Sequence, residues 1–141
     1  MESELIKSHP SLQIAIDIAL WMNFKYRIDE RSYGVIQDKK VHCYKVVETE
    51  GRRESSLVPL PSDYSKMTYE QIEAIRTNVN PLHHWEEMVG LFSSTHGETL
   101  RFILANAVPL EKLIRYELAI RGYDQNNLWV GFDKAGKIWL K

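Results

Sequence analysis

The sequence is poor in cysteine, with Cys43 as its single example among 141 residues. One cysteine cannot form a disulfide within the chain, and it excludes a zinc site built from several thiolates. Chains with so little cysteine are typical of a reducing compartment, so the composition predicts a cytoplasmic protein.

The chain also lacks a strong charge of either sign. It carries 18 Lys and Arg against 19 Asp and Glu, a formal net charge of -1. This balance argues against a strongly basic nucleic-acid binder and against an acidic solvating tail. A small basic excess is confined to residues 97–141, which hold seven Lys and Arg against five Asp and Glu.

Long hydrophobic runs are missing as well. The most apolar stretch, Ile14 to Phe24, is interrupted by Asp17 and follows Glu2 and Glu4 rather than a basic region. It is far too short to span a bilayer, and it does not have the pattern of a signal peptide. We therefore expect no membrane partner. The sequence has no Gly-rich phosphate loop either, and we predict no cofactor.

The N-terminal half has the pattern of one helix and a small sheet. Helical spacing of apolar residues predicts a helix over 10–25, capped by Ser8 or His9. β-Branched and aromatic residues predict a β-hairpin from 32–37 and 41–48. A third strand over 57–60 would lie at the sheet edge, because it contains a proline.

The C-terminal half has mainly helical patterns. Thr68 and Gln71 form a capping-box sequence at the start of one helix. Further helices are predicted from Asn80, over 98–105 and over 109–121, and strands over 128–132 and 137–140 would close the chain as a hairpin. The fold class is therefore α+β, with about five helices, a small antiparallel N-terminal sheet and a C-terminal β-hairpin. A single domain over 1–141 is expected, with 1–66 and 67–141 as the alternative subdivision.

Residues 97–141 suggest a nucleic-acid partner. A short helix, a tight turn, a longer helix and a hairpin are similar in order to a helix-turn-helix followed by a wing. Arg115 could then read guanine and Lys112 could contact phosphate, although Glu111 and Glu117 on the same helix would repel phosphate. Duplex DNA is thus one candidate partner, and the predicted contacts are Arg101, Lys112, Arg115, Tyr116, Lys134 and Lys137.

A histidine and glutamate cluster suggests a second kind of site. His83 and Glu87 are four residues apart on one predicted helix and can share a face. Together with His96 they could hold a divalent metal, although the spacing matches no recognised ligand signature. The alternative is a solvated helix face opposite Trp85, on which His83 and Glu87 form a modest pair.

The remaining aromatic residues gather near the C-terminus. Tyr123, Trp129, Phe132 and Trp139 are predicted to cluster there, with Trp129 and Trp139 as cross-strand neighbours in the hairpin. Core packing, stacking on single-stranded bases and a protein interface are the three uses that such a cluster allows.

No set of residues meets the joint needs of a nucleophile, a base and an orienting group, so we predict no catalytic residues. The favoured function is a small intracellular, non-enzymatic binding or regulatory protein that acts through protein–protein contacts or self-association. The first alternative is a DNA-binding regulator with a winged-helix-like segment over 97–141. The second is a metal-dependent enzyme that uses the histidine and glutamate cluster.

Overall fold

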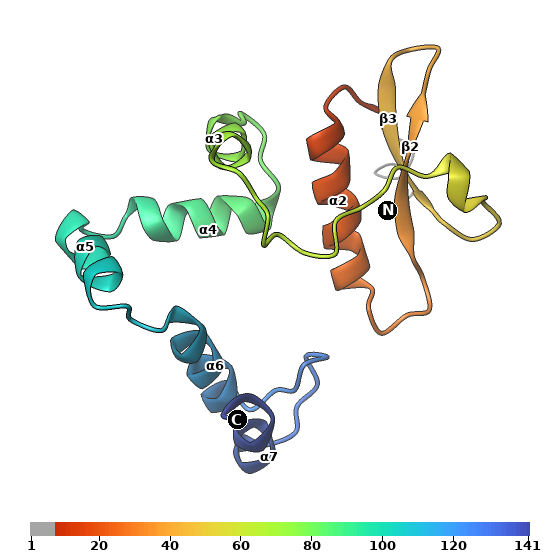
Figure 1. Cartoon of the computed structure of the whole chain (residues 1–141). Coiled ribbons are helices and arrows are strands. Elements are labelled where there is room, and N and C mark those ends of the chain that lie inside the picture. Colours follow the sequence, from red (N-terminus) through yellow and green to blue (C-terminus); the bar gives the residue numbers. More distant parts are fainter. Residues whose placement is uncertain (1–7) are drawn as a thin grey trace. The chain divides into compact units, whose positions relative to one another are not determined.

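The computed structural model of the protein describes residues 8–141, and it has a mixed α+β fold (Figure 1). Six α-helices and a three-stranded antiparallel sheet make up its regular structure over those residues. In chain order the elements are β1 (Ser8–His9), α2 (Leu12–Lys25), β2 (Tyr33–Asp38), β3 (Cys43–Glu48), the short 3-10 helix η1 (Glu54–Ser56), α3 (Tyr69–Thr77), α4 (His83–Ser93), α5 (Gly97–Ala105), α6 (Leu110–Arg121) and α7 (Phe132–Trp139).

The chain divides into two compact units, Met1–Glu87 and Met88–Lys141, and the boundary falls inside α4. The N-terminal unit contains the sheet, α2 and α3, whereas the C-terminal unit is built from helices. The single joint core expected from the sequence stays a prediction. No helix within residues 8–141 has both the length and the apolar character needed to cross a membrane.

The core of the N-terminal unit lies between α2 and the sheet. The strands contribute Tyr33, Val35 and Val46, all essentially inaccessible to solvent. Tyr33 and Val35 are two residues apart on β2 and therefore point to the same face. α2 meets them with Ala15 and Ala19, whose small side chains let the helix approach the sheet closely. Burial of each valine side chain stabilises the fold by roughly 1.5–3 kcal/mol.

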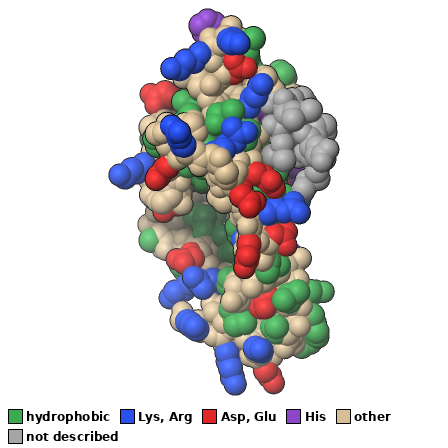
Figure 2. Space-filling view, turned by 90° about the vertical axis from the view of Figure 1, so that its right-hand side faces the viewer, with side chains coloured by type: hydrophobic (Ala, Val, Ile, Leu, Met, Phe, Trp, Pro, Cys, Tyr) green, Lys and Arg blue, Asp and Glu red, His purple; other side chains and the backbone are tan. Residues whose placement is uncertain are grey.

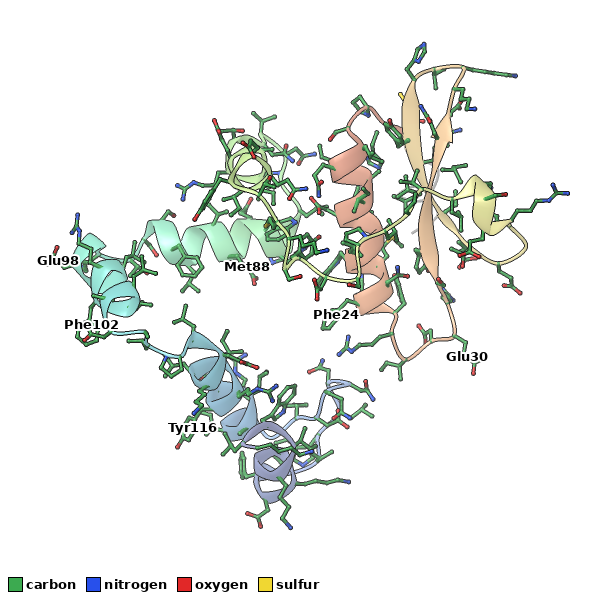
Figure 3. The ribbon with its side chains drawn as sticks, viewed as in Figure 1. Phe24, Glu30, Met88, Glu98, Phe102 and Tyr116 are labelled. Atoms are coloured by element: carbon green, nitrogen blue, oxygen red, sulfur yellow. The ribbon has the colours of Figure 1, made fainter. Side chains whose placement is uncertain are left out.

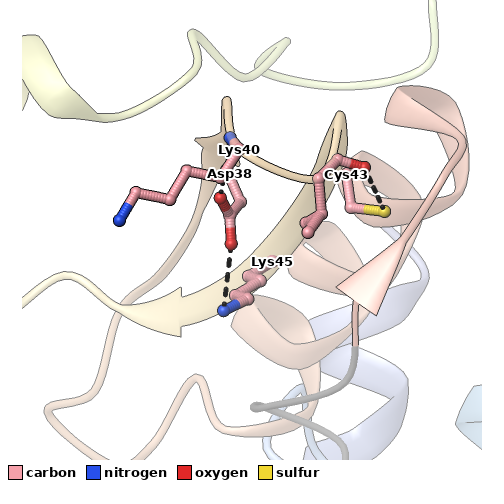
Figure 4. Close-up of polar contacts among 5 residues, drawn as sticks. Asp38, Lys40, Cys43 and Lys45 are labelled. Carbon is pink, nitrogen blue, oxygen red and sulfur yellow. Dashed lines mark hydrogen bonds and ion pairs between the residues drawn. The ribbon is translucent and has the colours of Figure 1, made fainter.

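The sheet has the strand order β1-β3-β2, so the predicted hairpin forms its main part. The register pairs Tyr33 with Glu48 at one end and Asp38 with Cys43 at the turn. Near that turn, the Lys45 Nζ atom lies 3.4 Å from Asp38 Oδ2, and the Cys43 thiol donates to the carbonyl of Val41 (Figure 4). The thiol is thus bound to local backbone.

A side-chain clamp fixes where β2 starts relative to α2. The backbone N–H of Tyr33 donates to Oδ1 of Asn23 over 2.7 Å, and Nδ2 of Asn23 donates to the carbonyl of Tyr33 over 3.0 Å. A one-residue slip of β2 would turn Tyr33 and Val35 away from the core. Asn23 therefore helps to set the register on which the core depends.

Two details of the N-terminal half differ from the sequence predictions. The first helix is capped by Ser11, not by Ser8 or His9, because Ser8 and His9 pair with β3 as the short strand β1. The third strand predicted over 57–60 does not form. The Val58 amide does donate a hydrogen bond to the carbonyl of Val35 on β2. The pairing with β2 does not continue into a strand, because the next residue, Pro59, has no N–H to donate.

The capping box of α3 is confirmed. The amide of Gln71 donates to the Thr68 hydroxyl over 3.2 Å, and the amide of Thr68 donates to Oε1 of Gln71 over 2.8 Å. Two backbone donors that the helix cannot satisfy internally are thereby paired.

The C-terminal hairpin prediction is wrong, because residues 132–139 form the helix α7. Only one isolated bridge, between Tyr123 and Trp129, remains of the expected strands. Phe132, Ala135 and Trp139 recur at helical spacing, and buried Ala135 allows close packing of α7 against α6. This helix is the sixth, where about five were expected.

Several contacts link the end of α6 to α7. The aromatic rings of Tyr123 and Phe132 both pack edge-on against Trp129, at centroid distances of 5.5 and 5.3 Å. Trp139 donates from Nε1 to the carbonyl of Tyr123 over 2.9 Å. The predicted aromatic cluster is therefore present, but Trp129 and Trp139 are not cross-strand neighbours.

Gly122 is the residue on which this packing depends most directly. It ends α6 at φ +80°, a backbone conformation that favours glycine, and a Cβ there would overlap the ring of Trp129. We expect Gly122→Ala to lower the free energy of unfolding by about 2–4 kcal/mol, from backbone strain and a displaced ring.

Gly131→Ala is the control for backbone strain without a clash. Gly131 has a φ of +88° and a ψ of 163°, and no atom lies within 4 Å of an added Cβ. This backbone region is almost restricted to glycine, so we expect a loss of about 1–3 kcal/mol from strain alone. Urea unfolding followed by Trp fluorescence measures both variants. A loss at Gly122→Ala below about 2 kcal/mol, the size of left-handed strain alone, would contradict the role assigned to the Trp129 contact.

Candidate functional site

The most unusual surface belongs to the C-terminal unit. In residues 88–141 the only buried hydrophobic residues are Ala119 and Ala135, and every large apolar side chain is at least partly exposed. A unit of this size gains little stability from so small a core. The unit therefore presents to solvent the kind of side chains that compact domains usually bury.

α6 carries five of these side chains. Ala119 is the buried residue of this helix, whereas five large apolar residues around the rest of its circumference have exposed fractions between 38% and 61%. Their spacing of three and four residues places them side by side along the helix. We call this set the α6 apolar face: Leu110, Leu113, Ile114, Tyr116 and Ile120.

α5 adds two more exposed apolar side chains. Phe102 is 60% exposed and Leu104 is 84% exposed. Phe102 and Tyr116 each project outward from their helix in Figure 3. Hydrophobic side chains, in green, also gather at the surface at the lower end of Figure 2, where the C-terminal elements lie. Exposed apolar surface of this extent marks interaction sites in soluble proteins.

The arginines of α5 and α6 are each paired with a glutamate of the same helix. Arg101 pairs with Glu98, Arg115 with Glu111 at 3.2 Å, and Arg121 with Glu117 at 2.8 Å. All three pairs have the three- or four-residue spacing of helix neighbours. The two helices therefore present little net charge of one sign beside their apolar residues.

The residues predicted to contact DNA lie on three helices. Arg101 is on α5, and Lys112, Arg115 and Tyr116 are on α6, as expected. Arg115 also donates to the carbonyl of Trp139 over 3.4 Å, so its side chain is engaged in the packing of α7. The predicted wing is absent because its two lysines, Lys134 and Lys137, lie on α7.

The predicted metal ligands are only partly brought together. Nε2 of His83 lies 2.8 Å from Oε1 of Glu87, which is the predicted pair, and both side chains are largely exposed. His96 belongs to the other unit, where it precedes α5. Over residues 8–141, no three His, Cys, Asp or Glu side chains lie close enough to hold a metal ion.

A pocket in the N-terminal unit was not expected from the sequence. Its volume is about 750 Å³, and one helix face, from Gln13 through Asp17 and Trp21 to Lys25, forms one wall. The facing wall comes from the end of α3 and the start of α4, including Ile75, Asn78, Asn80, Pro81, Leu82, His83, His84 and Trp85.

Asp17 lines this pocket and is 3% exposed. Its Oδ1 atom accepts hydrogen bonds from Nε2 of Gln13 over 2.9 Å and from the hydroxyl of Tyr64 over 2.8 Å. Gln13 in turn accepts from Nε2 of Gln71 over 2.9 Å. Because Gln71 also belongs to the capping box of α3, one continuous network joins α2, the segment before α3 and α3 itself.

The environment of Asp17 raises the pKa of its carboxyl above the ordinary value of 3.8. Burial is the largest cause, and the hydrogen bonds from Tyr64 and Gln13 act in the opposite direction without cancelling it. The pKa of Tyr64 is also raised. Burial is the largest cause, followed by the hydrogen bond to the Asp17 carboxylate and its negative charge. Tyr64 therefore stays a hydrogen-bond donor to Asp17 at neutral pH.

Aromatic rings form the rest of the pocket wall. The imidazole of His84 stacks on Trp21 with centroids 4.3 Å apart, and Trp85 packs edge-on against Tyr64 at 5.2 Å. Burial lowers the pKa of His84, so the ring is mainly neutral at pH 7. His84 is therefore partly covered by the Trp21 ring, whereas His83 and Glu87 on the same helix are largely exposed.

Comparisons with known proteins give no further guide to function, because no family model, no curated protein and no solved structure matches this chain. The candidate sites therefore rest on the residues and their geometry.

Replacement of Asp17 tests the network directly. Asp17→Ala leaves Tyr64 and Gln13 without their acceptor, and we expect it to lower the free energy of unfolding by about 1–3 kcal/mol. Asp17→Asn keeps an oxygen acceptor and removes the buried charge. We expect it to be at least as stable as the wild type at pH 7.

The pH dependence of stability separates the effect of the buried charge from the effect of the hydrogen-bond acceptor. A carboxyl whose pKa is raised by folding binds its proton more tightly in the native state, so its contribution to stability falls as pH rises from 3.8 through the raised value. The wild type should lose stability relative to Asp17→Asn over this window. Denaturant titrations at several pH values measure the difference, and a difference that does not change with pH would refute the assignment.

Proposed function

We propose that this protein is a non-enzymatic binding protein that self-associates through the apolar residues of α5 and α6. The observation that carries the proposal is the C-terminal unit, which buries only two alanines and exposes the whole α6 apolar face. Covering that face with a second copy would supply the core that the unit lacks. Regulatory or scaffolding activity would then depend on the assembled form.

The charge pattern favours a second copy as the occupant. A face with charge of one sign would repel itself in a symmetric dimer, in which the same patch meets its own copy. Here Glu111 and Glu117 are each neutralised by an arginine one turn away. The face is therefore compatible with itself, and no strongly charged partner is needed to complement it.

The same pairs weaken support for the DNA-binding alternative. Arg101 and Arg115 already contact carboxylates, and neutralisation of phosphates by free cations dominates DNA affinity. The metal-dependent enzyme has only the exposed His83 and Glu87 pair in its favour. Protein contacts are the function that the described geometry supports best.

Charged substitutions on the α6 apolar face test self-association. We expect the wild-type protein to sediment as a dimer or larger species at tens of micromolar, and Leu113→Asp or Ile120→Asp to shift it toward monomer. Each aspartate would be buried without a partner in the interface, which should weaken association at least about tenfold.

Val79→Asp is the matched control, since Val79 is fully exposed in the N-terminal unit. It adds the same charge in place of an apolar side chain, and it should leave the sedimentation unchanged. A wild-type protein that remains monomeric at these concentrations would show that the proposed occupant is wrong. Duplex DNA added to the same samples tests the alternative partner.

A further inference from the structure

We infer that the pocket beside α2 binds a small organic ammonium ion, with the charged nitrogen at Asp17 and the apolar part against Trp21 and Trp85. This site is separate from the self-association face, because every residue that lines it belongs to the N-terminal unit. The inference does not depend on the proposed function.

The first argument is the unsatisfied charge of Asp17. The hydrogen bonds from Gln13 and Tyr64 both go to Oδ1, so Oδ2 is the atom left to accept from a ligand in the pocket. No Lys, Arg or His among residues 8–141 forms an ion pair with this carboxylate. A buried anion without a cation costs free energy, and a cation that enters the pocket would recover part of that cost.

The second argument is the chemistry of the wall one turn along α2. Trp21 lines the pocket four residues after Asp17, and Trp85 lines the opposite side. Indole rings attract organic cations through their negatively charged faces and bury apolar groups equally well. Because His84 stacks on Trp21 as a neutral ring, it holds the indole in place without repelling a cation.

The other charged groups around the pocket restrict where a cation can lie. Lys25 follows Asp17 by eight residues, about 12 Å along the helix, so it repels a cation from the far end only. His83 is already hydrogen-bonded to Glu87. The attractive position is therefore the end that contains Asp17.

The size of the pocket sets the ligand class. A volume of about 750 Å³ falls in the range of pockets that hold drug-sized molecules. Primary aryl- or alkylammonium ions fit this combination of one anion and an aromatic wall. The amides of Asn78 and Asn80, which also line the pocket, offer hydrogen bonds to a polar group at the other end of such a ligand.

The experiment is a titration of the full-length, ¹⁵N-labelled protein with benzylammonium chloride, followed by NMR. Benzyl alcohol is the matched neutral ligand, because it has the same ring and nearly the same size. We expect saturable shifts in α2 and in residues 81–85 with the ammonium ion, and binding of the alcohol at least about tenfold weaker. Equal binding of the two ligands would overturn the inference, as would the absence of saturable shifts.

Two variants test the assigned contacts. Asp17→Asn removes the negative charge but keeps an acceptor for Tyr64, and it should abolish the preference for the ammonium ion. Glu70→Gln, at an exposed acid on α3, is the control for a general change of charge. Unchanged ammonium binding by Asp17→Asn would refute the role of the carboxylate.

Trp21→Leu provides a second readout, because Trp21 is 37% exposed and its replacement does not empty the core. It should weaken binding of both ligands through loss of the ring. The titration can be repeated with the Leu113→Asp protein. Binding that persists there shows that the pocket acts independently of self-association, whereas binding confined to the assembled protein would overturn the assignment to one unit.

Discussion

The hydrogen bonds that converge on buried Asp17 connect the parts of the N-terminal unit. Asp17 accepts hydrogen bonds from its own helix and from Tyr64, and Gln13 extends the contact to α3. These bonds reduce the cost of burying the charge but do not remove it, since the pKa of the carboxyl stays above its ordinary value. Stability and the shape of the pocket therefore have the same origin, because the residues that satisfy Asp17 also position the pocket wall.

The C-terminal unit is stabilised by a different kind of contact. Its helices are held by short-range contacts, such as the Trp129 cluster and the bond from Trp139 to the backbone of Tyr123. It lacks the large buried side chains that dominate folding energetics in compact domains. If a second copy covers these apolar residues, as proposed, folding and association of the unit become interdependent.

The sequence predicts those features of the fold that depend only on residues close together in the chain. The Thr68 and Gln71 capping box, the main hairpin and the αL end of α6 at Gly122 all follow from residue types at fixed spacing. Residues 128–132 and 137–140 are predicted to pair as strands across a turn at 133–136, whereas residues 132–139 form the helix α7. Packing of Ala135 against α6 decided the outcome, and such tertiary contacts are invisible in a local pattern. The Asp17 site was missed because Tyr64 lies 47 residues away.

The side chain of Gln71 makes two hydrogen bonds, and together they affect the dynamics of α3. Its carbonyl oxygen helps to start the helix at Thr68, while its amide nitrogen attaches the helix to Gln13. Loss of either contact frees the side chain that makes the other. The first turn of α3 and its attachment to α2 should therefore open together, as a single step, and amide hydrogens at both places would exchange with solvent at matched rates.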